Sequence, residues 1–161
     1  MGTTLITMED SHFAWLLGEA PAPDPNLRLP PGGLETAETI ARLRIYAAQL
    51  HESDCHGFWM IVDDGEIAGT VGYKHPPGKD HVVEIGYGLA ESRRRLGHAT
   101  RAVAALMAYA HDDPAVSCVV AKTHTDNVPS QKVLEKNGFE NLGPYTDPVH
   151  GEVILWRLAA E

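Results

Sequence analysis

Residues 81–110 constrain the fold of this chain most, because an extended segment, a short basic turn and a helix follow one another there. His81 to Leu89 is rich in β-branched and aromatic residues, which favour a strand. From Ala99 onward the apolar residues are spaced three and four apart, which predicts a helix through Ala110. The turn Arg94–Ala99 therefore lies where the chain passes from a strand into a helix N-terminus.

Such a turn can bind an anion such as phosphate. The first N–H groups of a helix have no partner within the helix, and the helix dipole is positive at that end. Gly97 lets an anion approach the backbone. Two familiar nucleotide loops are excluded, because Gly86-Tyr87-Gly88 is followed by Glu91 rather than a third glycine, and Gly97 is followed by His98 rather than lysine. A turn that binds nothing stays open as the alternative.

A second motif lies one predicted helix and one predicted strand further along, where residues 125–139 read TDNVPSQKVLEKNGF. Together with the turn, it resembles the acyl-CoA loop (Arg/Gln-x-x-Gly-x-Gly/Ala) and the later Asn-x-x-Ser…Lys-x-Gly-Phe motif of the GNAT superfamily of N-acetyltransferases. The resemblance runs from about Phe58 to Phe139. Glu-Ile-Gly-Tyr at residues 84–87 is most similar to the branch of ribosomal-protein N-terminal acetyltransferases.

The alternation of strand and helix patterns predicts an α/β (α+β) fold. The length favours one domain over residues 1–161. The resemblance implies a mixed, mostly antiparallel sheet of about six to seven strands flanked by about four helices. It also implies that the central strands separate to admit a pantetheine arm. Besides the central strand, we expect strands at Thr4–Thr7, Phe58–Val62, Glu66–Lys74, Val116–Ala121, Leu142–Tyr145 and Val153–Leu158. Besides the helix after the turn, we expect helices at Thr7–Leu17, Thr36–His51 and Pro129–Asn137.

Composition narrows the class of partner. A net charge of −9 argues against nucleic acid and favours a cationic substrate, although acidic surfaces also serve solubility alone. Cys55 and Cys118 are too few for a disulfide framework, and no leader or long apolar run appears, so we expect a cytoplasmic protein without membrane contact. No histidine pair has the spacing of a metal site, so no metal is expected. The oligomeric state stays open, with a homodimer as one option.

The resemblance implies acetyl-CoA as the acyl donor and assigns contacts to three segments. Main-chain groups of Tyr87, Gly88 and Leu89 are expected to pair with pantetheine like an added strand, and one N–H to donate to the oxyanion. Asn127 and Ser130 are expected to contact the cofactor, although Asn127 also suits a helix cap. The backbone of the turn is expected to hold the pyrophosphate. The turn residues are Arg94, Arg95, Leu96, Gly97, His98, Ala99 and Thr100, and the arginines expected to add charge are Arg93, Arg94, Arg95 and Arg101.

Glu84 and Ser130 are the expected catalytic residues. An alkyl amine with a pKa near 10.4 is almost fully protonated at neutral pH, so Glu84 is expected to relay its proton through water. The alternative is that Glu84 pairs with a strand neighbour. Ser130 is expected to protonate the departing thiolate, or else is simply a first-turn helix residue. Leu134 stands where many relatives carry a tyrosine as the acid, and Lys122 where some carry a glutamate. The tyrosines that could substitute for that acid are Tyr87, Tyr109 and Tyr145.

These patterns predict an N-acetyltransferase that moves an acetyl group directly from acetyl-CoA to a primary amine, without a covalent acyl-enzyme. The acceptor is expected to be a protein N-terminus or a small cationic molecule. The alternative is an acyl-CoA-binding module that has lost catalysis, which the absence of the tyrosine keeps open. Segment 19–33, rich in proline and glycine, is expected either to wall the acceptor site or to be a plain surface loop.

Overall fold

Seven strands form one mixed sheet in the computed structural model, which describes residues 2–160. Their order is β1-β2-β3-β4-β5-β7-β6, and all neighbours are antiparallel except β4 and β5. This arrangement confirms the expected fold class. The strands are β1 (Thr3–Thr7), β2 (Phe58–Asp63), β3 (Glu66–Tyr73), β4 (Val82–Leu89), β5 (Cys118–His124), β6 (Glu140–Asp147) and β7 (Gly151–Ala159). The helices are α1 (Asp10–Leu16), α2 (Ala37–Glu52), α3 (His98–His111) and α4 (Val128–Lys136), with a short 3-10 turn, η1, at Glu91–Arg93.

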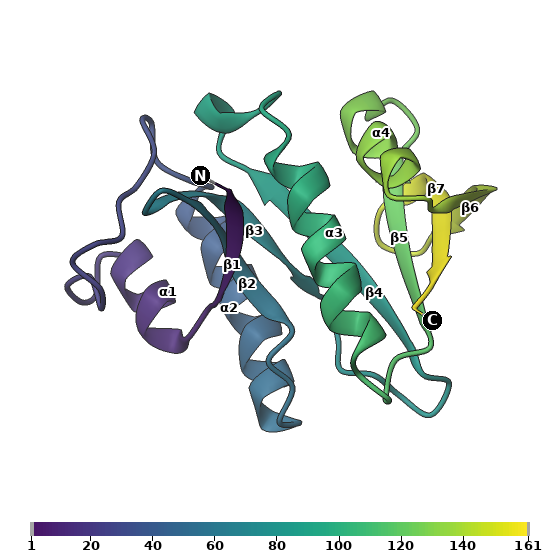
Figure 1. The fold of residues 1–161 in the computed structure, drawn as a ribbon, viewed down its shortest axis with the longest axis horizontal. Coiled ribbons are helices and arrows are strands. Elements are labelled where there is room, and N and C mark those ends of the chain that lie inside the picture. Colours follow the sequence, from purple (N-terminus) through teal and green to yellow (C-terminus); the bar gives the residue numbers. More distant parts are fainter. Residues whose placement is uncertain (1, 161) are drawn as a thin grey trace.

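Helices cover both faces of the sheet. α3 packs across β1 to β4 on one face, where its residues Ala102, Val103 and Leu106 are fully buried. α1 and α2 pack against each other, and Figure 1 shows α2 behind the sheet, on the face opposite α3. Ile40 and Leu50 of α2 are buried on that side. The core therefore lies in two layers, with β2 and β3 between them.

Local chemistry explains where the N-terminal elements begin and end. Asp64 and Gly65 both have positive φ, as a two-residue hairpin turn requires, so the expected hairpin between β2 and β3 is confirmed. The expected start of the first helix at Thr7 is wrong. Thr7 stays in β1 opposite Trp59, and Glu9 caps the helix instead, because its N–H donates to His12 Nδ1 at 2.9 Å.

The C-terminal strands also differ from their expected bounds. Val116 is held in a turn by the hydrogen bond from its N–H to Asp113 O, so β5 begins at Cys118 rather than at Val116. β5 then continues to His124, because β7 pairs with it along its whole length. β6 and β7 are longer than expected, since they also pair with each other over Glu140–Asp147.

The parallel pair β4 and β5 separates partway along. Their pairing runs from Val82 opposite Cys118 to Ile85 opposite Ala121 and then stops. Beyond that point β4 continues beside β3 as far as Leu89, whereas β5 continues beside β7. The expected separation of the central strands is therefore present, and it lies just before the turn that leads into α3.

Candidate active site

The separation leaves one edge of β4 open. Lys74 N donates to Glu84 O, and Ala90 N donates to Ala68 O, so the even-numbered residues of β4 turn their main-chain polar groups toward β3. Main-chain groups alternate sides along a strand, so those of Tyr87 and Leu89 face the side that β5 has left. An extended ligand can pair with this edge as an added strand. Gly88 lies between them. It turns its main-chain polar groups toward β3, and it has no side chain that could cover the strand.

The turn before α3 presents a second set of free donors. Arg95 and Gly97 have φ of 67° and 82°, which bends the backbone left-handed at both positions. Within residues 2–160, the N–H groups from Leu96 to Thr100 donate to no carbonyl or side chain. The first turn of α3 also lacks an acidic residue. Successive free N–H groups at a helix N-terminus form a site for an anion.

The arginines near the turn divide into two kinds. Arg93 donates to both carboxylate oxygens of Glu66, and this hydrogen bonding lowers the pKa of Glu66. Arg101 donates to Thr3 Oγ1 at 2.8 Å. Both therefore tie the turn to neighbouring strands, β3 and β1, rather than standing free for a ligand. The arginines of the turn that remain exposed are Arg94 and Arg95.

His98 contributes its backbone to the turn, while its side chain packs beneath it. The residue is 4% exposed, and its Nδ1 lies 3.3 Å from Thr3 Oγ1. Burial lowers the pKa of His98, and the charge of Arg101 lowers that pKa further. A neutral, buried imidazole leaves the anion site to the main chain.

Glu84 lies between two lysines on the face opposite α3. Its carboxylate oxygens are 2.9 Å from Lys74 Nζ and 3.2 Å from Lys122 Nζ, and its side chain is 17% exposed. Burial alone would raise the pKa of Glu84, but the hydrogen bond from Lys74 and the charges of both lysines outweigh it and hold that pKa below its ordinary value. Lys122 also contacts Asp147 at 2.8 Å. The geometry matches the ion-pairing role that the sequence left open for Glu84.

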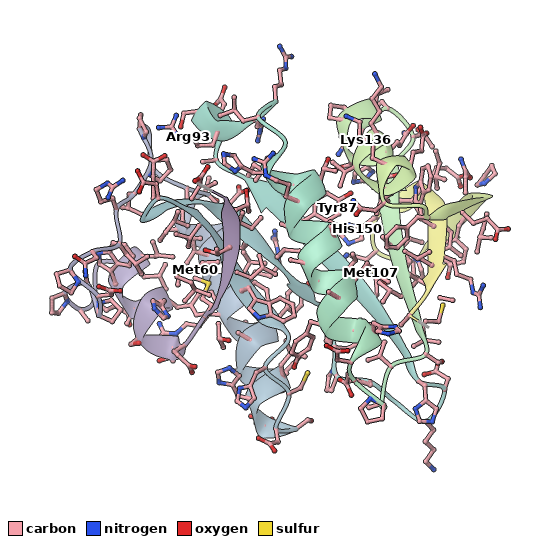
Figure 2. All side chains as sticks on the ribbon, viewed as in Figure 1. Met60, Tyr87, Arg93, Met107, Lys136 and His150 are labelled. Atoms are coloured by element: carbon pink, nitrogen blue, oxygen red, sulfur yellow. The ribbon has the colours of Figure 1, made fainter. Side chains whose placement is uncertain are left out.

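Residues of α4 meet β4 across the gap. Asn127 Oδ1 accepts a hydrogen bond from Ser130 N at 3.2 Å and so caps α4. The Tyr87 hydroxyl donates to Ser130 O at 3.0 Å, and burial raises the pKa of Tyr87 to about 12. Figure 2 shows Tyr87 on the side of α3 that faces α4, well away from Arg93. Ser130 and Tyr87 are thus brought together beside the open edge.

The other two tyrosines that could replace the missing acid lie elsewhere. Tyr109 packs edge-on against Trp59, with ring centroids 4.8 Å apart, on the α3 side of the sheet. Tyr145 lies under Lys122, whose Nζ is 5.3 Å from the ring centroid. Leu134, at the position of the expected tyrosine, is fully buried. Among these tyrosines, Tyr87 is the one that contacts Ser130.

One residue near the site was missed by sequence reasoning. A Cβ atom at Gly88 would lie 3.0 Å from Glu35 Oε1, so this carboxylate sits directly over the open part of β4. The sequence indicated segment 19–33 for the acceptor wall, two residues short of Glu35. The available signal was the position of Glu35 immediately before the helix cap Thr36, at the end of that loop.

Among residues 2–160, no three His, Cys, Asp or Glu side chains gather in a way that could hold a metal ion. The ring centroids of His124 and His150 lie 6.2 Å apart, and no third such group joins them within the described residues. In the same part of the chain, no helix has the length and apolar character that crossing a bilayer requires.

Comparison with known proteins agrees with this geometry. Residues 4–140 match the family model described as an acetyltransferase (GNAT) domain. The uncharacterized N-acetyltransferase YjdG of Bacillus subtilis is 39% identical over 83 residues, which cover 50% of this chain and 49% of that protein. The chain spans about half to two thirds of the length of the curated relatives it matches.

Solved structures share the fold at low sequence identity. RimL, a ribosomal-protein alpha-N-acetyltransferase in complex with coenzyme A, superposes with a TM-score of 0.72 at 20% identity, covering 98% of this chain and 93% of that one. The aminoglycoside acetyltransferase AAC(6')-Ib, also in complex with coenzyme A, superposes with a TM-score of 0.69 at 20% identity, covering 98% and 95%.

Proposed function

This chain belongs to the GNAT acetyltransferase family, and on that premise we propose that it transfers the acetyl group of acetyl-CoA directly to a primary amine. The observation that carries the proposal is the separation of β4 from β5 beside the α3 turn. It places an open strand edge and a row of free N–H groups one after the other along the chain. A pantetheine arm fits the first and a pyrophosphate fits the second.

In this proposal the main chain holds the donor. Tyr87 and Leu89 pair with the pantetheine amides, and the N–H groups from Leu96 to Thr100 hold the pyrophosphate, with the exposed Arg94 and Arg95 adding charge. Asn127 uses its Oδ1 for the helix cap, so its Nδ2 is the atom that would donate to the cofactor. When bound, acetyl-CoA supplies an activated thioester.

The transfer needs three contributions from the protein. The new N–C bond forms as the C–S bond breaks, so the amine must lose a proton and the thiolate must gain one. An open N–H of β4 donates to the developing oxyanion. Ser130 stands beside the gap as the proposed proton donor to the thiolate, and Glu84 on the opposite face is the proposed relay for the proton of the amine.

The acceptor class is proposed as a protein N-terminus or a small cationic amine. RimL is a protein alpha-N-acetyltransferase and AAC(6')-Ib is an aminoglycoside acetyltransferase, so the shared fold serves both kinds of acceptor. The net charge of −9 favours a cation in either case. The second candidate function is an acyl-CoA-binding module without catalysis, which the buried Leu134 at the position of the acid favours.

Two measurements on the full chain test the proposal. Titration calorimetry with coenzyme A is expected to show binding, and thiol release from acetyl-CoA is expected with at least one amine in a panel of short peptides, diamines and aminoglycosides. Binding without thiol release for the whole panel would favour the binding module. Absence of coenzyme A binding would overturn both candidates.

A further inference from the structure

We infer that Glu35 receives the acceptor as an alkyl ammonium ion and holds it over β4, which makes the acceptor site selective for charged amines. The inference rests on the proposed function above. It adds an acceptor-binding residue from the loop between α1 and α2, and it narrows the acceptor class to amines that arrive protonated.

The position of Glu35 relative to β4 is the first ground. Glu84, Gly86 and Gly88 alternate with the residues that face α3, so their Cα positions share the opposite face. Over this face, Lys74 Cε lies 3.1 Å from a Cβ built at Gly86, and Glu35 Oε1 lies 3.0 Å from one built at Gly88. The two glycines thus form a floor with an ammonium over one end and a carboxylate over the other.

The floor also lies beside the reactive end of the proposed donor. Gly88 lies between Tyr87 and Leu89, whose main-chain groups form the open edge proposed for the donor. With its pyrophosphate at the turn before α3, a donor paired with that edge would direct its acyl end back along β4 toward Tyr87, and the carboxylate of Glu35 lies over the next residue, Gly88. An ammonium that donates a hydrogen bond to this carboxylate is then held near the bond that must form.

The backbone around Glu35 is fixed on both sides. Thr36 follows directly and caps α2, with its Oγ1 accepting from Thr39 N at 3.2 Å. Before it, Ser92 Oγ donates to Pro31 O at 2.7 Å, which ties the loop to the connection between β4 and α3. Because both ends of this short stretch are held, the carboxylate is presented from a defined position rather than from a free loop.

Charge pairing distinguishes Glu35 from the other carboxylates on this face. Glu84 is compensated by Lys74 and Lys122, and Asp147 is compensated by Lys122. Within residues 2–160, Glu35 has no lysine, arginine or histidine within ion-pair distance. An exposed carboxylate without a partner attracts a cation, and the ammonium of an acceptor supplies one.

The test compares Glu35→Gln with Glu38→Gln. Glu38 lies in the first turn of α2, so its replacement removes the same charge one turn away. The charged probes are 1,4-diaminobutane and the tripeptide Ala-Gly-Gly, and the neutral probe is 4-methylaniline. We expect Glu35→Gln to raise KM for the charged probes about 10- to 100-fold, which is the range for one charge-assisted hydrogen bond. KM for the neutral probe should stay unchanged. Glu38→Gln should change none of them.

The control measurement is the Kd for coenzyme A, which should be equal in the wild type and both variants. Equal KM values for the charged probes in Glu35→Gln and Glu38→Gln would overturn the inference while leaving the proposed function intact. A wild type that binds coenzyme A but acetylates neither charged probe would overturn the inference as well. A wild type that does not bind coenzyme A would overturn the proposed function itself.

Discussion

Replacing Glu84 with glutamine separates a catalytic role from a structural one. The change keeps the shape of the side chain but removes the charge that Lys74 and Lys122 approach at 2.9 Å and 3.2 Å. Losing the carboxylate leaves Lys74 without its ion-pair partner and leaves Lys122 with Asp147 alone, so we expect about 1–3 kcal/mol less stability. For a chain of this size, that loss corresponds to a fall in Tm of about 2–12 °C.

The proposed relay adds a second, kinetic effect. A general base contributes about 10²–10⁴-fold, so kcat of Glu84→Gln should fall by that factor while the Kd for coenzyme A stays constant. Thermal denaturation, thiol-release kinetics and calorimetry measure the three quantities, and the matched control is Glu140→Gln, which removes an exposed charge at the start of β6. A normal kcat together with a lowered Tm would refute the relay and leave Glu84 as an ion-pair residue.

The same variant makes a prediction about pH. The pKa of Glu84 is held below its ordinary value of about 4.3, so the folded state binds its proton more weakly than the unfolded state. Its contribution to stability is therefore present above that unfolded value and is lost as the pH falls through the folded pKa. Urea unfolding should show a constant difference between wild type and Glu84→Gln above about pH 5 and a narrowing difference below about pH 4. A difference that stays the same down to pH 2 would contradict this assignment.

Three further changes test the cofactor side. Gly97→Val places a β-branched residue at a φ of 82°, with a Cβ 2.6 Å from Arg101 Nη1. Calorimetry should therefore show a large loss of coenzyme A affinity, while circular dichroism shows a retained fold. Unchanged affinity would remove the turn from the site. Asn127→Ala removes the cap of α4 and should cost about 1 kcal/mol of stability, whereas an additional rise in KM for acetyl-CoA would reveal a cofactor contact. Tyr87→Phe removes the hydrogen bond to Ser130 O and should lower Tm with kcat preserved, and a loss of kcat would instead identify Tyr87 as the acid.

Local chemistry in the sequence was enough to place the turn and its helix. Gly97 is followed by helical spacing, and the turn is built from consecutive residues, so its place between strand and helix follows from the local sequence. The cap at Asn127 is equally local, since it accepts from Ser130 N three residues later. The first helix shows the limit of the same reasoning, because the cap at Glu9 uses His12, a residue outside the usual capping set.

Pairing between residues far apart in the sequence determined which side chains meet at the site, and the sequence did not indicate these partners. Arg93 meets Glu66 across 27 positions, so a residue that seemed available for the cofactor belongs instead to the support of the turn. Lys122 reaches Glu84 because the parallel register of β4 and β5 places them on one face, with Glu84 opposite Val120. Register of this kind follows from tertiary packing rather than from spacing along the chain.

The alternation of glycine in β4 is a local sequence pattern whose meaning depends on the long-range pairing of the sheet. Gly86-Tyr87-Gly88 matched no nucleotide fingerprint, so as a sequence motif it carried no function. In the sheet the same alternation puts both glycines on the face away from α3, where Lys74 and Glu35 lie within 3.1 Å of the positions that two Cβ atoms would take. It also leaves Tyr87 between them, directed to the other face and to Ser130. β4 therefore carries both the proposed donor edge and the proposed acceptor floor, because its side chains alternate between faces and Gly86 and Gly88 leave one face bare.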